Sequence, residues 1–168
     1  LLQPLGAVAE VEAVALPDAL DRVLAADVIC PVNVPPHDNS AMDGYAFAGS
    51  ELEQARPGQP LMLRVVGTAL AGGPWQGRLG AGECVKIMTG AVMPVGADTV
   101  VAHEQASADQ ECIQFDGHAL RAGANRRLRG EDLEQGSVAL RAGQRLTPAA
   151  LGLLASLGLG KVSVRRRL

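Results

Sequence analysis

Short apolar runs separated by glycine and proline turns fill the middle of the chain. The runs have the length of strands, and several alternate apolar and polar residues in the pattern of a half-buried strand. In the run 83–88, Cys84 and Lys86 fall on one face while Val85 and Ile87 fall on the other. Strands at this density predict a compact β-domain. The predicted strands cover residues 61–67, 83–88, 99–102 and 112–115.

The N-terminal segment shows a helical pattern. Between residues 17 and 26, Leu20, Val23 and Leu24 follow one another at three- and four-residue spacing, which predicts a short amphipathic helix. Residues 28–30 then form an apolar run that ends at a proline, so we expect a strand there.

A second helix is predicted near the other end of the chain. Thr147 is a good N-cap residue, Pro148 suits the first helical position, and Gly158 suits the stop. The expected apolar face consists of Leu151, Leu154 and Ala155, and a strand over residues 162–168 should follow the helix.

The composition narrows the functional classes. Of the 168 residues, 48% are hydrophobic but only 2% are aromatic, so the core must be built from Leu, Val and Ala. The net charge of −3, without a basic stripe, argues against a nucleic-acid partner. No apolar run approaches the roughly 18 residues of a membrane span. The absence of a secretory signal favours the cytoplasm.

The three cysteines predict neither a disulfide framework nor a zinc site. Cys30, Cys84 and Cys112 are an odd number and lack a Cys-x-x-Cys spacing. We expect each to act as a small buried hydrophobic residue. The chain begins with Leu1 rather than Met and ends in a strand-like segment, which we interpret as part of a longer protein.

The polar loop at residues 34–46 is the strongest candidate for chemistry. Two consecutive prolines exclude a regular helix, and the Asp38-Asn39-Ser40 run favours a turn. Asp43 follows and precedes Gly44. A carboxylate held in an ordered loop can bind a divalent metal or act as a general base. The alternative is a surface turn with solvated acids.

Two further segments contain candidate ligand-binding residues. Thr89 lies where a predicted strand meets the Gly90-Ala91 turn, so its hydroxyl could receive an oxyanion or could simply belong to a hairpin turn. Downstream, a second cluster contains Arg127, Arg129, Glu131 and Asp132. Its guanidinium groups could bind phosphate, or the four side chains could neutralise one another at the surface.

Together the three segments resemble the MoeA/gephyrin family of molybdenum insertases. The matching blocks are Asp38-Asn39-Ser40-Ala41-Met42-Asp43-Gly44-Tyr45-Ala46, Ile87-Met88-Thr89-Gly90-Ala91 and Arg129-Gly130-Glu131-Asp132. The resemblance implies a β-rich α+β fold of two interleaved lobes. An elongated lobe would combine residues 1–37 with 128–168, and a β-rich lobe would span 38–127. The family's large C-terminal molybdopterin-binding domain would lie outside this chain.

The resemblance also implies a function. A protein of this family would transfer molybdate onto adenylylated molybdopterin (molybdopterin-AMP) and release AMP, with Mg²⁺ as the expected metal, while this chain alone would be inactive. It would act as a homodimer, and further partners could be the molybdopterin adenylyltransferase and molybdoenzyme acceptors. A non-catalytic dimerisation or scaffold module is the alternative. The resemblance assigns catalysis to Asp43, Thr89 and Asp132, metal binding to Asp43, and substrate binding to Asn39, Ser40, Arg127 and Arg129.

Overall fold

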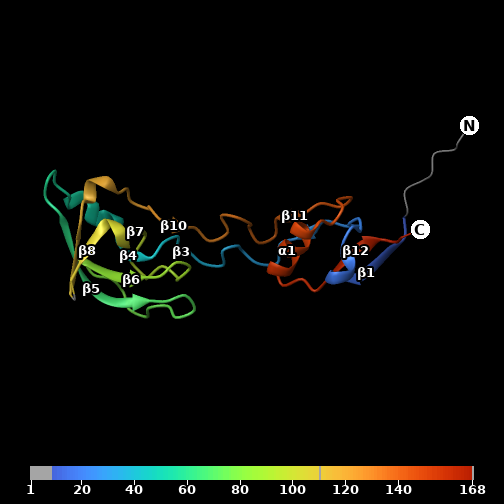
Figure 1. The fold of residues 1–168 in the computed structure, drawn as a ribbon, viewed down its shortest axis with the longest axis horizontal. Helices are drawn as coiled ribbons and strands as arrows, with labels where there is room; N and C mark the ends of the chain where they lie inside the picture. Colours follow the sequence, from blue (N-terminus) through green and yellow to red (C-terminus); the bar gives the residue numbers. More distant parts are fainter. Residues whose placement is uncertain (1–8, 110, 168) are drawn as a thin grey trace, which may run out of the picture. The chain divides into compact units, whose positions relative to one another are not determined.

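The computed structural model describes residues 9–109 and 111–167 of the chain, which divide into two compact units. One unit combines residues up to 34 with those from 132 onward, and the other comprises residues 35–131 (Figure 1). The sequence-based lobes were 1–37 with 128–168, and 38–127, so the loop around Arg129 now joins the β-rich unit. Residues 1–8 of the predicted elongated lobe, and Leu168 at the end of the predicted terminal strand, lie outside the described residues.

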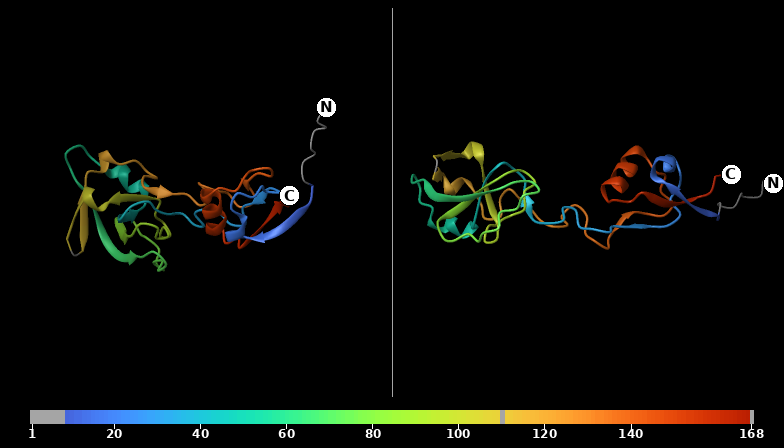
Figure 2. Two further views of the ribbon diagram at one scale, coloured as in Figure 1. Left: turned by 45° about the vertical axis from the view of Figure 1, so that its right-hand side comes forward. Right: turned by 90° about the horizontal axis from the view of Figure 1, so that it is seen from below.

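The β-rich unit is built on one mixed sheet of six strands in the order β7-β4-β6-β5-β9-β8. Only the β5–β6 pair is parallel, and the views in Figure 2 show the sheet curling on itself. The strands are β4 (Gly44–Phe47), β5 (Leu61–Ala69), β6 (Glu83–Ile87), β7 (Thr99–Ala102), β8 (Ala106–Ala108) and β9 (Cys112–Phe115). Short elements complete the unit: β3 (Asn39–Ser40), β10 (Arg126–Arg127), and the 3-10 helices η2 (Gly49–Gln54), η3 (His103–Gln105) and η4 (Gly117–Ala119).

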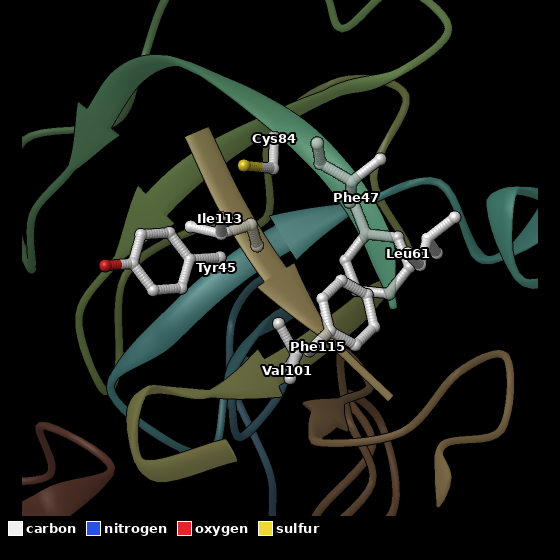
Figure 3. Close-up of a cluster of buried hydrophobic side chains, with 8 residues drawn as sticks. Tyr45, Phe47, Leu61, Cys84, Val101, Ile113 and Phe115 are labelled. Atoms are coloured by element: carbon white, nitrogen blue, oxygen red, sulfur yellow. The ribbon is translucent and has the colours of Figure 1, made fainter. Parts of the chain in front are cut away.

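Both faces of this sheet are covered by hydrophobic side chains. Along β4, Tyr45 and Phe47 point into one cluster, and Ala46 points into the other. The first cluster includes the ring pair Phe47–Phe115, with centroids 5.3 Å apart (Figure 3). Trp75 packs against the second cluster. The alternation predicted for β6 is confirmed, because Cys84 joins the first cluster while Val85 and Ile87 join the second.

The other unit contains two short ladders and one helix. Strand β1 (Val11–Ala15) pairs antiparallel with β12 (Lys161–Arg165), and β2 (Val28–Ile29) pairs with β11 (Val138–Leu140). Helix α1 (Pro148–Ser156) begins as predicted, since the Thr147 hydroxyl accepts a hydrogen bond from the Ala150 N–H at 3.3 Å. Within the helix, the Leu154 side chain is fully buried. Ala155, which was expected on the same face, is exposed.

The prediction of a helix over residues 17–26 is wrong. Only a single 3-10 turn, η1 (Leu16–Ala19), forms there, and Asp21 adopts a left-handed φ of 62°. The following backbone groups pair with the C-terminal segment: the Leu24 N–H donates to the carbonyl of Gln144, and the Ala25 N–H donates to that of Ser163. Tertiary pairing therefore prevails over the local helical pattern.

The mostly β character with few helices confirms the predicted fold class. None of the helices in the described residues is long and apolar enough to cross a membrane. The cysteines are all free thiols; Cys30 and Cys84 are buried as predicted, while Cys112 is only half-buried.

Candidate functional site

Asp43 and Thr89 form the centre of the candidate site. One carboxylate oxygen of Asp43, Oδ1, accepts hydrogen bonds from the Thr89 N–H at 2.7 Å and from the Thr89 hydroxyl at 2.6 Å. Both residues lie at strand ends, Asp43 just before β4 and Thr89 just after β6, and these strands pair antiparallel. The sheet therefore brings together two side chains that lie 46 positions apart in the sequence.

Gly44 allows the strands beside Asp43 to approach closely. A Cβ atom at Gly44 would lie 2.0 Å from the carbonyl oxygen of Val101 on β7. Next to this contact, the Asp43 carbonyl accepts a hydrogen bond from the His103 N–H at 3.0 Å. The backbone of Asp43 is thus fixed by His103, the first residue after β7, and its side chain is fixed by Thr89.

The same hydrogen bonds control the charge of Asp43. The Thr89 hydroxyl and then the Thr89 N–H, with a smaller contribution from His103, hold the pKa of the Asp43 carboxyl below its ordinary value. The carboxylate is exposed to solvent and ionised at neutral pH. Both hydrogen bonds go to Oδ1, and no described residue bonds to the second oxygen, Oδ2. The site therefore presents an oriented, anionic oxygen.

Ser40 connects the loop before Asp43 to the turn after Thr89. Its backbone N–H donates to the Ala91 carbonyl at 3.0 Å, and its carbonyl accepts from the Gly90 N–H at 2.8 Å. Its buried hydroxyl donates to the Met42 carbonyl at 2.5 Å. Ser40 therefore points into the loop and shapes it, and its side chain does not face solvent.

The third predicted segment joins the same site through β3 and β10. Arg126 pairs with Ser40 and Arg127 pairs with Asn39 in an antiparallel ladder. Within this ladder, the Asn39 Oδ1 and Arg126 Nε atoms are buried without a hydrogen-bond partner. The Asn125 carbonyl also accepts a hydrogen bond from the Ala41 N–H at 2.9 Å.

Two carboxylates hold the arginine loop in shape. Asp38 accepts a hydrogen bond from the backbone N–H of Arg129 at 2.8 Å, and its second oxygen lies 3.8 Å from the Arg126 guanidinium. Glu131 binds Arg127 Nε at 2.6 Å and the Leu128 N–H at 2.7 Å. The Arg129 side chain is exposed and makes no ion pair or hydrogen bond with the described residues.

The structure thus places six of the seven predicted site residues in the β-rich unit. Asp43, Thr89, Asn39, Ser40, Arg127 and Arg129 lie in segments that contact one another through the bonds described above. Asp132 belongs to the other unit, where its backbone N–H donates to the Val34 carbonyl at 3.0 Å.

Sequence reasoning missed the contributions of Asp38, Asn125 and His103. Asn125 adopts a left-handed φ of 58° and donates its side-chain amide to the Val100 carbonyl at 2.9 Å. An Asn after Gly and Ala, before a run of arginines, is a turn signal that could have marked this position. His103 gave no sequence signal, because its position opposite Asp43 depends on the strand register.

Metal binding at this site would depend on the Asp43 carboxylate. Among residues 9–109 and 111–167, no three His, Cys, Asp or Glu side chains gather as a metal site would require. Asp43 fits one part of a Mg²⁺ shell, since Mg²⁺ in phosphate-transferring sites is commonly held by one or two carboxylates together with phosphate oxygens and water.

Comparison with known proteins defines the class to which this fold and site belong. The crystal structure of a molybdopterin biosynthesis MoeA protein from Pyrococcus horikoshii matches 94% of the chain with a TM-score of 0.88 and 34% sequence identity. The two-unit, β-rich architecture is therefore that of MoeA-type proteins. The model of the MoeA N-terminal region (domain I and II) matches residues 1–158, and the chain belongs to this family.

Curated relatives share this region at substantial identity. The molybdopterin molybdenumtransferase of Haemophilus influenzae is 40% identical over 168 residues, which is 100% of this chain and 40% of the relative. The molybdopterin molybdenumtransferase of Synechococcus elongatus is 40% identical over 159 residues, covering 94% of this chain and 39% of the relative. The chain thus spans about two fifths of the length of the curated relatives it matches.

Proposed function

We propose that this chain is the N-terminal region of a molybdopterin molybdenumtransferase, which transfers molybdate onto adenylylated molybdopterin and releases AMP. The family and the names of the relatives support the reaction class. The observation that carries the proposal is the convergence of three polar segments, at Asp43, at Thr89 and around Arg129, into one hydrogen-bonded site.

In this proposal Asp43 supplies the reactive carboxylate. Thr89 orients it and keeps it ionised, so that its Oδ2 can bind a metal ion or position a water molecule. Mg²⁺, when bound, would neutralise charge on phosphate oxygens. Asp43 is the residue of this chain that would hold it.

The arginine loop has the character of a phosphate receptor. Arg129 presents a guanidinium without a partner in the described part of the chain, and guanidinium groups bind phosphate in a bidentate manner. Arg127 is held by Glu131 and would support the loop. Ser40 and Asn39 would shape the same edge from within the β3–β10 ladder, where the Asn39 Oδ1 is buried. Substrate binding by these two residues stays a prediction from the family resemblance. A catalytic role for Asp132 rests on the family resemblance alone.

The test is molybdate-dependent AMP release by the full-length protein. We expect Asp43→Asn to abolish release while the protein stays folded, because the amide carries no negative charge. Asp109→Asn is a matched control: hydrogen bonds from the Glu111 and Cys112 N–H groups lower the pKa of Asp109 too, but it lies in the β8–β9 turn. This control should retain full activity.

Two results would contradict the proposal at different levels. Retained activity in Asp43→Asn would show that the reaction does not need the Asp43 carboxylate. No AMP release by the full-length protein, despite stable assembly, would favour the scaffold function instead.

Self-association is part of the same proposal. In the unit with α1, the cross-strand pair Ile29 and Val138 is 50% and 39% exposed, which suits burial against a second copy. Ile29→Asp should shift the sedimentation coefficient towards that of a monomer. Met62→Asp changes an even more exposed apolar residue, on β5 of the other unit, and should not. The free thiols fit the proposed cytoplasmic location.

A further inference from the structure

A hollow of about 490 Å³ opens on the β-rich unit between the end of β7, η3 and the segment that leads into β10. The side chains of Met42, Leu120 and three alanines give it an apolar lining, and Glu104 and Arg121 add opposite charges. None of these side chains takes part in the hydrogen bonds around Asp43. The volume falls within the range of about 300–1,000 Å³ that is usual for small-molecule sites.

Strand β7 is an edge of the sheet, and its open side faces the hollow. The His103 N–H donates towards β4, to the Asp43 carbonyl, whereas the Val100 N–H donates away from β4, to the Ala124 carbonyl at 3.0 Å. Because N–H groups alternate between the two sides of a strand, the Ala102 N–H points to the same side as that of Val100. Ala102 lines the hollow, and no acceptor for its N–H occurs among the described residues. The hollow therefore offers a backbone donor to a ligand.

The two charged side chains of the hollow are not neutralised by the described part of the protein. Glu104 and Arg121 are exposed, and neither side chain makes an ion pair or hydrogen bond, with each other or with another described residue. A ligand that is positive at one end and negative at the other can pair with both. Such charge complementarity fixes the direction in which the ligand lies.

These features together suit a short peptide with free ends. An extended peptide can pair its carbonyl groups with the open edge of a strand, and a guanidinium binds a carboxylate in a bidentate manner. We propose that the hollow binds an apolar zwitterion of about dipeptide size, with its ammonium group on Glu104 and its carboxylate on Arg121. A peptide carbonyl accepts from the Ala102 N–H, and the apolar side chains contact Met42 and Leu120. A free amino acid carries the same charges but has no peptide carbonyl.

The direct test is a ¹H–¹⁵N NMR titration of this chain with the dipeptide Leu-Leu, its N-acetyl form, its C-terminal amide and free leucine. Leu-Leu should shift the amide signals of residues 102–105 and 119–125 and saturate. The acetyl form and the amide should each bind about fivefold more weakly, because each lacks one charged end.

Three results would overturn the proposal. One is the absence of saturable shifts in these two segments. Another is binding of the acetyl form as tight as that of Leu-Leu, which would assign the hollow to the C-terminus of a protein. The third is binding of leucine as tight as that of Leu-Leu, which would assign it to a free amino acid.

Matched variants assign each charged end to its side chain. Glu104→Gln should abolish the preference for Leu-Leu over its acetyl form but keep the preference over the amide. Arg121→Gln should do the reverse, because each variant removes the partner of one end only. Glu53→Gln and Arg78→Gln make the same changes at exposed positions outside the hollow and should keep both preferences. Unchanged preferences in Glu104→Gln and Arg121→Gln would refute the assignment.

Ala102→Pro tests the backbone contact separately. The φ of Ala102 is −65°, which proline also adopts, and the lost N–H points away from β4, so the β4–β7 ladder keeps its bonds. This variant should weaken Leu-Leu, its acetyl form and its amide alike by about fivefold. The amide signals of β4 should stay at their parent positions, which shows that the sheet is folded. Parent-like affinity in the folded variant would refute the contact with Ala102.

Calorimetric titration of the full-length protein with Leu-Leu decides whether the hollow is open there. We expect the same affinity as for this chain, and the same loss of preference in Glu104→Gln and Arg121→Gln. Absence of binding would show that the hollow is covered in the full-length protein and would overturn the proposal. The proposal does not depend on molybdate transfer, because none of its measurements involves AMP release.

Discussion

Replacing Gly44 by Ala tests whether the close packing of β4 against β7 holds Asp43 in place. The added Cβ would lie 2.0 Å from the Val101 carbonyl oxygen and 3.0 Å from its carbon, and both are backbone atoms that cannot rotate away. Because contacts under 3.0 Å are essentially never seen, the two strands must separate by about 1 Å.

That separation has a cost that can be worked out from the structure. The hydrogen bond from the His103 N–H to the Asp43 carbonyl is 3.0 Å long, and an added ångström takes it beyond hydrogen-bonding distance. Losing one or two ladder bonds costs about 0.5–1.5 kcal/mol each, and overpacking adds about 1–3 kcal/mol. We therefore expect Gly44→Ala to lower the free energy of unfolding by about 3 kcal/mol, a large part of a typical small-domain stability.

Urea unfolding followed by the fluorescence of Trp75 measures this loss, because Trp75 packs in the second cluster of the same unit. With a typical m of about 1–3 kcal/mol per molar urea, the midpoint should fall by about 1–3 M. Gly152→Ala is the matched control. Gly152 lies in α1, where a Cβ would meet nothing within 4 Å, so the same substitution should stabilise its unit by about 0.5–1 kcal/mol. A midpoint in Gly44→Ala equal to that of the parent chain would refute the reasoning.

Three further predictions follow from individual contacts. Thr89→Val removes the hydroxyl that donates to Asp43, so the pKa of Asp43, measured by carboxyl ¹³C NMR, should rise towards its ordinary value; an unchanged pKa would contradict the hydrogen bond. Burial, with a smaller contribution from Cys112, raises the pKa of the Cys84 thiol to about 12. Its stability contribution is then fully present below the unfolded pKa near 9 and is lost as the pH rises towards 12, and Cys84→Ala should flatten the loss of unfolding free energy in that window. Thr147→Ala should destabilise α1 by about 1 kcal/mol in urea unfolding monitored by circular dichroism, whereas Thr147→Ser should restore the cap.

The strands were predictable because their signals are local. Each of the runs at β5, β6, β7 and β9 is bounded by turn residues and has the length of one strand. The start of α1 was equally local, since Thr147 and Pro148 mark it within two residues. The order of strands in the sheet was not predictable in this way, because the parallel β5–β6 pair depends on contacts that no single window of sequence contains.

The failed helix at residues 17–26 shows the limit of periodicity. Leu20 and Val23 stand at helical spacing, but they are 41% and 38% exposed, and only Leu24 is buried. The backbone groups of this segment bond to residues within 143–165, so its conformation is decided by a partner more than a hundred positions away. The hydrophobic pattern of one segment contains no information about such a distant partner, so it cannot predict that pairing will replace the helix.

The candidate site follows the same division between local and distant causes. Asp43 and Thr89 could be found because each stands beside a glycine at a strand end, where a polar side chain can point out of the sheet. The role of Asp38 could not be found from the sequence, since its carboxylate binds the backbone N–H of Arg129, 91 residues further along the chain. Its carboxylate supports the loop and leaves the Arg129 guanidinium exposed. The residues that shape the site are therefore harder to find from sequence than the residues that present its charges, because shaping depends on distant backbone groups while charge is a property of one residue.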